Sequence, residues 1–477
     1  MFTQRFNTAS RATVIFLLVS ALQFLSSWLL LPFYLSRFSL EEFGVNELMN
    51  RVSIIAGFLV SLRISAAMAN QYFQLNDAGS KNRFVSSLFI FTLLTAALGC
   101  LVFLLFGPRL FDVFFARSGF DFWPYGCTAL LTGILGNVMA PGLFFLRNEQ
   151  RLRPFFLISA GFIAFNFFGQ LAAMYLFRFN FRELAITRSV LALLQMLLMA
   201  LWCFRRFGMH FDMPVIRRAL RYTLPLIPFL VLNWLQLYYD RFFVGREYGA
   251  GVLGVFSVLV IAGSIHTACV DVFENVYRPV WMKGFMDPGA SSKLMASQRH
   301  YLAGIIFTAS CILFACILLP VVTSRPVYMQ YAPLFIPVVA ASVCKGISLL
   351  FIQQLVYRER SGLLLAVAAL QFLLTWLCYH FLGRGHDVGR VIQINVLLQL
   401  LFTALFYGAA QRIFPVAFNR FWLFAAYGYV LLLLLLGYWA AHASVSLPLV
   451  LGLQCLPVVV LFLLSAAFRD SSSKKTI

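Results

Sequence analysis

Long apolar runs dominate the chain, and charged residues fall between them at regular intervals. An apolar run of about 18 residues or more predicts a membrane-spanning helix, because about 20 helical residues cross the hydrocarbon core of a bilayer. The predicted spans are 12–36, 46–70, 84–106, 124–146, 154–177, 183–204, 223–245, 252–277, 301–323, 333–357, 363–382, 391–410, 421–441 and 448–468. We therefore predict an all-α polytopic membrane protein with about 14 transmembrane helices.

The composition narrows the class of protein further. Of the 477 residues, 61% are hydrophobic and 11% are charged, which excludes a soluble multidomain protein, a disordered chain and a secreted disulfide scaffold. The nine cysteines are scattered without a C-x-x-C pair, which predicts buried thiols rather than disulfides or metal ligands. No nucleotide-binding, zinc-protease or serine-hydrolase signature occurs, so we expect neither an enzyme nor a cofactor or metal site.

Charge predicts the topology. The chain has 37 Lys and Arg residues against 17 Asp and Glu, a net charge of +20. With a cytoplasmic N-terminus, the predicted cytoplasmic segments carry more than twice as many basic residues as the outside loops, as positively charged loops resist translocation. This bias accounts for the net charge without a nucleic-acid partner and predicts that both termini are cytoplasmic.

One cytoplasmic stretch, 205–222, alternates arginines with apolar residues and predicts a short amphipathic helix along the inner leaflet. It separates six predicted helices from eight. We expect two pseudo-symmetric six-helix lobes and a C-terminal helix pair. The predicted divisions are an N-lobe at 1–204, the linker at 205–222, a C-lobe at 223–410, and helices 13 and 14 with a cytoplasmic tail at 411–477.

Several charged residues lie inside predicted spans, where each costs about 2.5 to 3.5 kcal/mol and usually faces a cavity or a partner. The basic ones are Arg51, Arg63, Arg188, Arg241 and Lys345. Four of the five are arginines, whose planar guanidinium suits phosphate, so we predict that they bind an anionic substrate.

Local pairing is the alternative for each of these cations. Glu47 lies one turn before Arg51 on the same helical face, which favours a structural ion pair there. Asp240 is adjacent to Arg241 but points about 100° away from it, so we expect the partner of Arg241 on another helix.

Three acidic residues inside spans, Asp240, Asp271 and Glu274, are candidates for ion coupling. Asp271 and Glu274 share one helical face and, together with His266, could hold a coupling proton or sodium ion. A salt bridge to Arg278 is the alternative.

Two regions carry recognisable motifs. The first is Leu30–Arg37 (LLPFYLSR) with Leu40–Val45 (LEEFGV), and the second comprises Leu224–Pro228, Tyr239–Phe243 and Gly251–Ser257 (GVLGVFS). They resemble the corresponding motifs of Wzx-type polysaccharide flippases, which belong to the multidrug/oligosaccharidyl-lipid/polysaccharide (MOP) exporter superfamily. One departure is Phe256, where that family often has Tyr.

The resemblance implies two six-helix lobes in a V around a central cationic cavity, in the inner membrane of a bacterium. It also implies flipping of an undecaprenyl-pyrophosphate-linked oligosaccharide to the outer leaflet by alternating access, for O-antigen or exopolysaccharide biosynthesis. Asp240 and Arg241 match the family motif directly. The expected partners are membrane lipid, the lipid-linked oligosaccharide, a polysaccharide polymerase and the chain-length machinery.

Other functions remain open. A lipid II flippase would be chemically close to the oligosaccharide flippase. A drug/cation antiporter of the same superfamily would instead be expected to need an acidic cavity. A membrane-embedded polysaccharide polymerase would be expected to present a large outside loop, yet the longest predicted one is 107–123.

Overall fold

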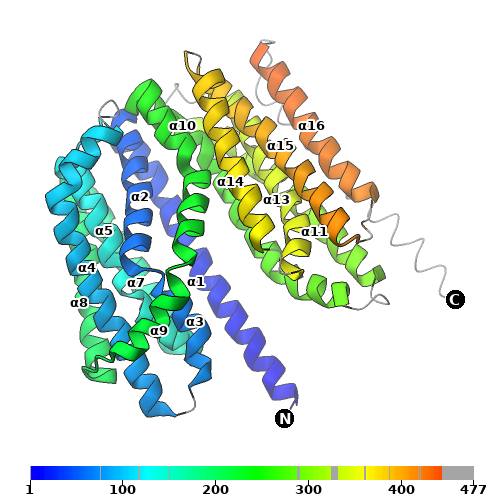
Figure 1. Ribbon diagram of the computed structural model, residues 1–477. Coiled ribbons are helices and arrows are strands. Elements are labelled where there is room, and N and C mark those ends of the chain that lie inside the picture. Colours follow the sequence, from blue (N-terminus) through cyan, green and yellow to red (C-terminus); the bar gives the residue numbers. More distant parts are fainter. Residues whose placement is uncertain are drawn as a thin grey trace. The chain divides into compact units, whose positions relative to one another are not determined.

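The computed structural model (Figure 1) describes residues 2–75, 77–115, 119–149, 151–286, 291–323, 331–358, 361–385, 387–416, 418 and 420–442. Contacts within the chain define two compact units, Met1–Gly254 and Val255–Ile477. Among the described residues, eleven helices are long and apolar enough to cross a membrane. The protein is therefore an all-α, multi-pass membrane protein, as predicted.

The helices of the first unit are α1 (Phe2–Arg37), α2 (Leu40–Ser61), α3 (Ile64–Gln71), α4 (Ala78–Phe115), α5 (Cys127–Val138), α6 (Ala140–Asn148), α7 (Leu152–Tyr175), α8 (Phe181–Phe207), α9 (Met213–Thr223) and the first part of α10 (Leu226–Met286). The second unit contains the rest of α10, then α11 (Ser291–Thr323), α13 (Phe335–Tyr357), α14 (Ser361–Cys378), α15 (Val388–Ile413) and α16 (Arg420–His442). The last predicted span, 448–468, lies outside the described residues.

The long helix α10 contains two of the predicted spans. Its apolar part, Leu230–Arg278, has 49 residues, about 70 Å of helix against a hydrocarbon core of about 30 Å. Gly249 divides it with a φ of +84°, a conformation that residues with a Cβ rarely adopt. The spans predicted at 223–245 and 252–277 therefore correspond to the two arms of α10.

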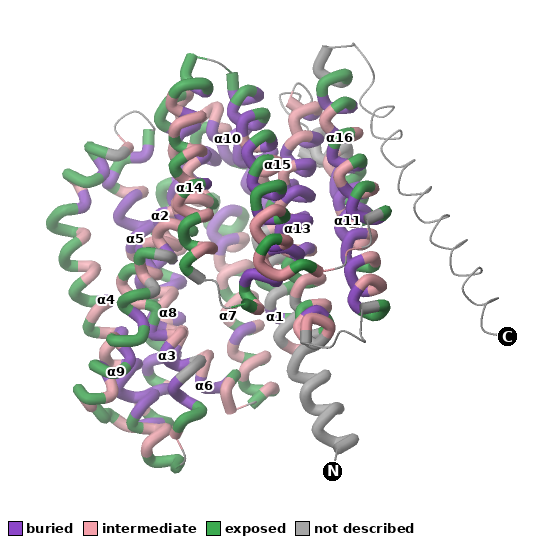
Figure 2. The backbone as a smooth tube through the Cα atoms, turned by 45° about the vertical axis from the view of Figure 1, so that its right-hand side comes forward, coloured by how far each residue is buried: buried purple, intermediate pink, exposed green. Residues whose placement is uncertain are grey.

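Each unit has one central helix. In the first unit α5 packs against α2, α4 and α8, and in the second α13 packs against α11, α15 and α16. Most of α13 is buried (Figure 2). The helices α5 and α13 lie within the fourth and tenth predicted spans. Each therefore belongs to the fourth span of its predicted lobe and packs on the third and sixth. The segment 223–254, which was predicted to begin the C-lobe, packs within the first unit. The division into two six-helix lobes stays a prediction.

Two glycines of the motifs bring α2 and α10 into close contact. A Cβ built on Gly44 would lie 2.0 Å from the Ala250 carbonyl oxygen, and one on Gly254 would lie 2.0 Å from the Leu40 carbonyl oxygen. Each glycine therefore accepts the backbone of the other helix, so the two motifs meet in space although about 200 residues of sequence separate them. This crossing positions the charged residues that follow Gly44.

The expectation that the cysteines are buried is wrong for Cys311. All eight cysteines among the described residues are free thiols, and Cys127, Cys203 and Cys344 are buried, but Cys311 is exposed. An apolar run does not distinguish an inward-facing thiol from one on the apolar outer surface of a membrane protein, since both surroundings are apolar.

Replacing Gly254 with Ala should destabilise the protein, because the added methyl group would overlap a backbone atom that cannot move without separating α2 from α10. We expect the free energy of unfolding to fall by about 1 to 3 kcal/mol. The detergent-purified variant should therefore have a lower thermal unfolding temperature. Gly161→Ala is the matched control, because no atom lies within 4 Å of a Cβ built at that position. Equal unfolding temperatures for the two variants would contradict the close crossing.

Candidate functional site

A buried ion cluster joins α2 to the first arm of α10. Glu47 on α2 forms ion pairs with Arg51 on the same helix and with Arg241 on α10, where the Arg241 Nε lies 3.4 Å from the Glu47 carboxylate. The side chains of Glu47 and Arg241 are 7% and 6% exposed. The structural pairing predicted for Arg51 and the interhelix partner predicted for Arg241 are therefore both present.

Asp240 also pairs with Arg241, against the expectation from helical geometry. The Arg241 Nη1 donates to both Asp240 carboxylate oxygens, at 2.8 and 2.9 Å, and to the Leu237 carbonyl at 3.0 Å. The arginine side chain is long enough to fold back along its own helix, so the direction of the Cβ did not decide the contact. Glu47 and Asp240 together balance the charges of Arg51 and Arg241.

Arg188 on α8 is held differently, by three neutral side chains from three other helices. Its Nε donates to Gln170 Oε1 of α7 at 2.9 Å, its Nη1 to Asn46 Oδ1 of α2 at 2.5 Å, and its Nη2 to Tyr34 Oη of α1 at 2.5 Å. Tyr34 Oη in turn donates to Gln170 Oε1 at 2.5 Å. We call Tyr34, Asn46 and Gln170 the neutral cage.

The neutral cage fixes the Arg188 guanidinium without cancelling its charge. No carboxylate among the described residues forms an ion pair with Arg188. A guanidinium has five N–H donors, so the three cage bonds leave two for another acceptor. The Arg188 side chain is half-buried, about 10 Å along α8 from its first residue. The arrangement can bind an anion at a preset orientation.

Arg63 lies at a break between α2 and α3. Leu62 and Arg63 both adopt left-handed backbone conformations, with φ of 46° and 55°, which cost about 1 to 2 kcal/mol each for residues with a Cβ. The Arg63 side chain is exposed and has no ion pair or hydrogen bond within the part of the chain that the structure describes. Like Arg188, it is a cation inside a predicted span without a carboxylate partner among the described residues.

In the second unit, Lys345 is half-buried on α13, and its charge acts on the exposed Asp271 of α10. Glu274 pairs with Arg278 at 3.4 Å and accepts a hydrogen bond from Gln353 at 2.5 Å, so the salt bridge named as the alternative is present. His266 is fully buried, with Nε2 donating to the Ile305 carbonyl and Nδ1 bonded to Ser342 Oγ, both at 2.9 Å.

Sequence reasoning missed the neutral cage. Its members are uncharged and come from three separate spans, so neither charge nor helical periodicity connects them to Arg188. The available signals were weak: Tyr34 lies inside the first motif, and Asn46 follows it by one residue.

Replacing Glu47 with Gln should strongly destabilise the protein, because Arg51 would lose the carboxylate with which it pairs and Arg241 would keep only Asp240 among the described residues. Removing one partner of a buried ion pair costs about 3 to 5 kcal/mol, which a thermal unfolding measurement in detergent would detect. Glu41→Gln, an exposed position on the same helix, should unfold close to the wild-type temperature. An unchanged unfolding temperature for Glu47→Gln would show that the cluster contributes nothing to the fold.

Comparisons with known proteins agree with this architecture. The chain is similar to the structure of the lipid II flippase MurJ in its inward closed conformation, with 13% identity, a TM-score of 0.68, and coverage of 96% of this chain and 99% of that one. It is also similar to the Vibrio cholerae MATE transporter VcmN in the bent form, with 14% identity, a TM-score of 0.50 and coverage of 85% and 97%. At these identities the likeness establishes the fold alone. No curated protein matches the chain.

The family follows from the sequence. The profile of a family described as polysaccharide biosynthesis protein matches residues 35–323, more than half of the chain. This match contains the whole second motif and most of the first, so the predicted resemblance to polysaccharide flippases is confirmed at the level of the family. The chain belongs to the polysaccharide biosynthesis protein family, and its fold is shared with MurJ and the MATE transporters.

Proposed function

We propose that this protein is a flippase that moves an undecaprenyl-pyrophosphate-linked oligosaccharide from the cytoplasmic to the outer leaflet for surface or extracellular polysaccharide biosynthesis. The observation that carries the proposal is Arg188, a permanent cation held inside the membrane by neutral partners only. A pyrophosphate would supply the missing negative charge and accept the two remaining N–H groups, with the bidentate geometry that guanidinium favours.

The five basic residues have different proposed roles. Arg188 contacts the pyrophosphate. Arg63 is also unpaired in the described part of the chain, but it lies about 25 Å along α2 from Asn46, which Arg188 contacts, so it would contact the headgroup at a different stage of transport. Lys345 is the proposed anion-binding residue of the second unit. Arg51 and Arg241, which share Glu47 and Asp240, stabilise the helices that present Arg188.

The proposed ion-coupling role rests mainly on Asp271. Asp240 and Glu274 already hold arginines, whereas Asp271 is exposed and interacts with Lys345. An ion bound at Asp271 would change the charge next to Lys345, so binding of the ion and of the anionic headgroup would influence each other.

The proposed orientation in the membrane rests on the distribution of basic residues. In the first unit, the connections at the α9 end are strongly basic, and by the positive-inside rule this end faces the cytoplasm. We therefore propose a location in the bacterial inner membrane with both termini in the cytoplasm. A polymerase and chain-length machinery would then use the transported product on the outer side of that membrane.

A lipid II flippase is the second candidate, favoured by the similarity to MurJ across nearly the whole chain. Lipid II also carries a prenyl pyrophosphate, so Arg188 would serve both substrates. Depletion of the protein in its native host separates them: viable cells that lack a surface glycan indicate the oligosaccharide, and lysis indicates lipid II.

Replacing Arg188 with Gln should abolish transport, because glutamine occupies the neutral cage without a positive charge. In cells whose only copy is Arg188→Gln, we expect loss of the surface polysaccharide at normal levels of membrane-inserted protein. In proteoliposomes, the variant should fail to move a fluorescent prenyl-pyrophosphate oligosaccharide between leaflets. Arg182→Gln, an exposed position on the same helix, is the matched control. Wild-type polysaccharide and transport in Arg188→Gln would refute the assigned role.

A further inference from the structure

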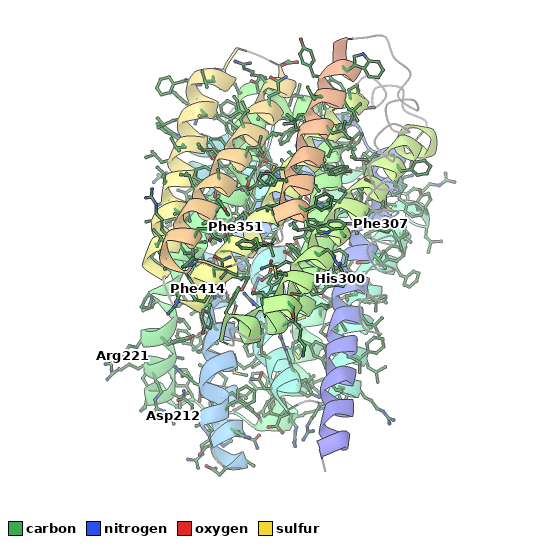
Figure 3. The ribbon with its side chains drawn as sticks, turned by 90° about the vertical axis from the view of Figure 1, so that its right-hand side faces the viewer. Asp212, Arg221, His300, Phe307, Phe351 and Phe414 are labelled. Atoms are coloured by element: carbon green, nitrogen blue, oxygen red, sulfur yellow. The ribbon has the colours of Figure 1, made fainter. Side chains whose placement is uncertain are left out.

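The short helix α9 presents three arginines on one outward face. Arg217, Arg218 and Arg221 are all exposed, whereas Ile216 and Ala219 on the opposite face are buried. Arg221 extends away from the ribbon in Figure 3. Arg217 and Arg221 are one helical turn apart, and Arg218 lies beside them, so the three charges occupy one side of an 11-residue helix.

These arginines have no partner within the described residues. No ion pair or side-chain hydrogen bond involves any of the three. The acidic groups at this end are Asp77, Glu149 and Asp212. Asp77 accepts a hydrogen bond from the Ser80 amide at 2.7 Å. The hydrogen bond from Tyr72 and the charge of Lys81 hold the pKa of Glu149 below its usual range, so this carboxylate is both ionised and occupied.

Apolar side chains flank the basic face. Met213 is 55% exposed, Leu224 48% and Tyr222 40%. Exposed apolar residues beside arginines are typical of helices at a membrane interface, where the apolar groups reach the acyl chains and the guanidinium groups stay at headgroup level. The helix is at that level because α4 and α7 begin, and α6 and α8 end, at the same end of the unit.

The helix is fixed to the membrane-spanning helices, so its basic face is rigidly presented. Gln71 Nε2 at the end of α3 donates to the Arg218 carbonyl at 3.3 Å. The segment before α9 is tied to α4, where Ser86 Oγ donates to the Gly208 carbonyl at 2.8 Å and Ser87 Oγ to the His210 carbonyl at 3.2 Å. The buried face of α9 packs against α3 and α4.

We propose that the outward face of α9 is a docking surface for anionic phospholipid headgroups. Charge complementarity identifies the occupant: three unpaired guanidinium groups at headgroup depth attract phosphatidylglycerol or cardiolipin, and a zwitterionic lipid offers no net charge to them. The bound headgroups hold α9 against α3 and α4, so anionic lipid stabilises this end of the first unit. This surface is separate from Arg188 and does not depend on which substrate is moved.

The test uses the purified full chain in detergent with added dioleoylphosphatidylglycerol or dioleoylphosphatidylcholine, and it measures the thermal unfolding temperature. The anionic lipid should raise this temperature by a few degrees more than the zwitterionic lipid, because a ligand that binds only the folded state stabilises it. The triple variant R217Q/R218Q/R221Q should lose this difference. A triple variant that keeps the full difference overturns the proposal.

The matched control is R109Q/R182Q/R246Q, which removes three exposed arginines from the other ends of α4, α8 and the first arm of α10. This control variant should retain the difference in unfolding temperature between the two lipids. If the control also lost that difference, the effect would depend on net charge alone, and the proposal would be overturned.

Three further measurements cover a triple variant that does not fold. High salt should abolish the lipid effect in the wild type, because screening weakens interactions between exposed charges, and an effect insensitive to salt would refute the docking surface. R217K/R218K/R221K should keep it. Inorganic phosphate at the same concentration should not reproduce it, and equal stabilisation by phosphate would show a simple anion site instead of a lipid surface.

Discussion

A charge inside hydrocarbon needs a partner, and Glu47 supplies one for two arginines at once. Its carboxylate contacts Arg51 on its own helix and Arg241 on α10, close to the level at which Gly44 and Gly254 let the two helices touch. The Glu47–Arg241 pair needs the close crossing to bring its side chains within reach, and through this pair the crossing gains a polar link that apolar packing would not provide. The interaction thus links two helices that lie far apart in the sequence.

Arg188 differs from Arg51 and Arg241 in how its charge is compensated. Arg51 and Arg241 are compensated by Glu47 and Asp240, so they explain the stability of the helix pair without any ligand. Arg188 is held by three hydrogen bonds, but no carboxylate in the described part of the chain neutralises it and every cage partner is uncharged. Leaving a cation uncompensated within a membrane is costly, and an anionic substrate that arrives and leaves is a simple reason to retain it.

Much of the fold could be predicted from the sequence, because membrane spans and their order follow from apolar runs alone. The Glu47–Arg51 pair could also be predicted, since residues four apart on a helix are neighbours. The neutral cage could not be predicted, because Tyr34, Asn46 and Gln170 come together only through tertiary packing and carry no charge to mark them. The break at Leu62 and Arg63 was also invisible, as neither glycine nor proline occurs there.

That break divides one predicted span into two pieces with different attachments. The upstream piece, α2, packs mainly on α5, whereas the downstream piece, α3, is held by Asn148 Nδ2 on the Met68 carbonyl and by its contact with α9. Arg63 lies at the break between the two pieces, so a rotation of either piece relative to the other would move its guanidinium. The position of this cation is thus set by the angle between two separately anchored helices, and that angle can change without altering the packing of α2 on α5.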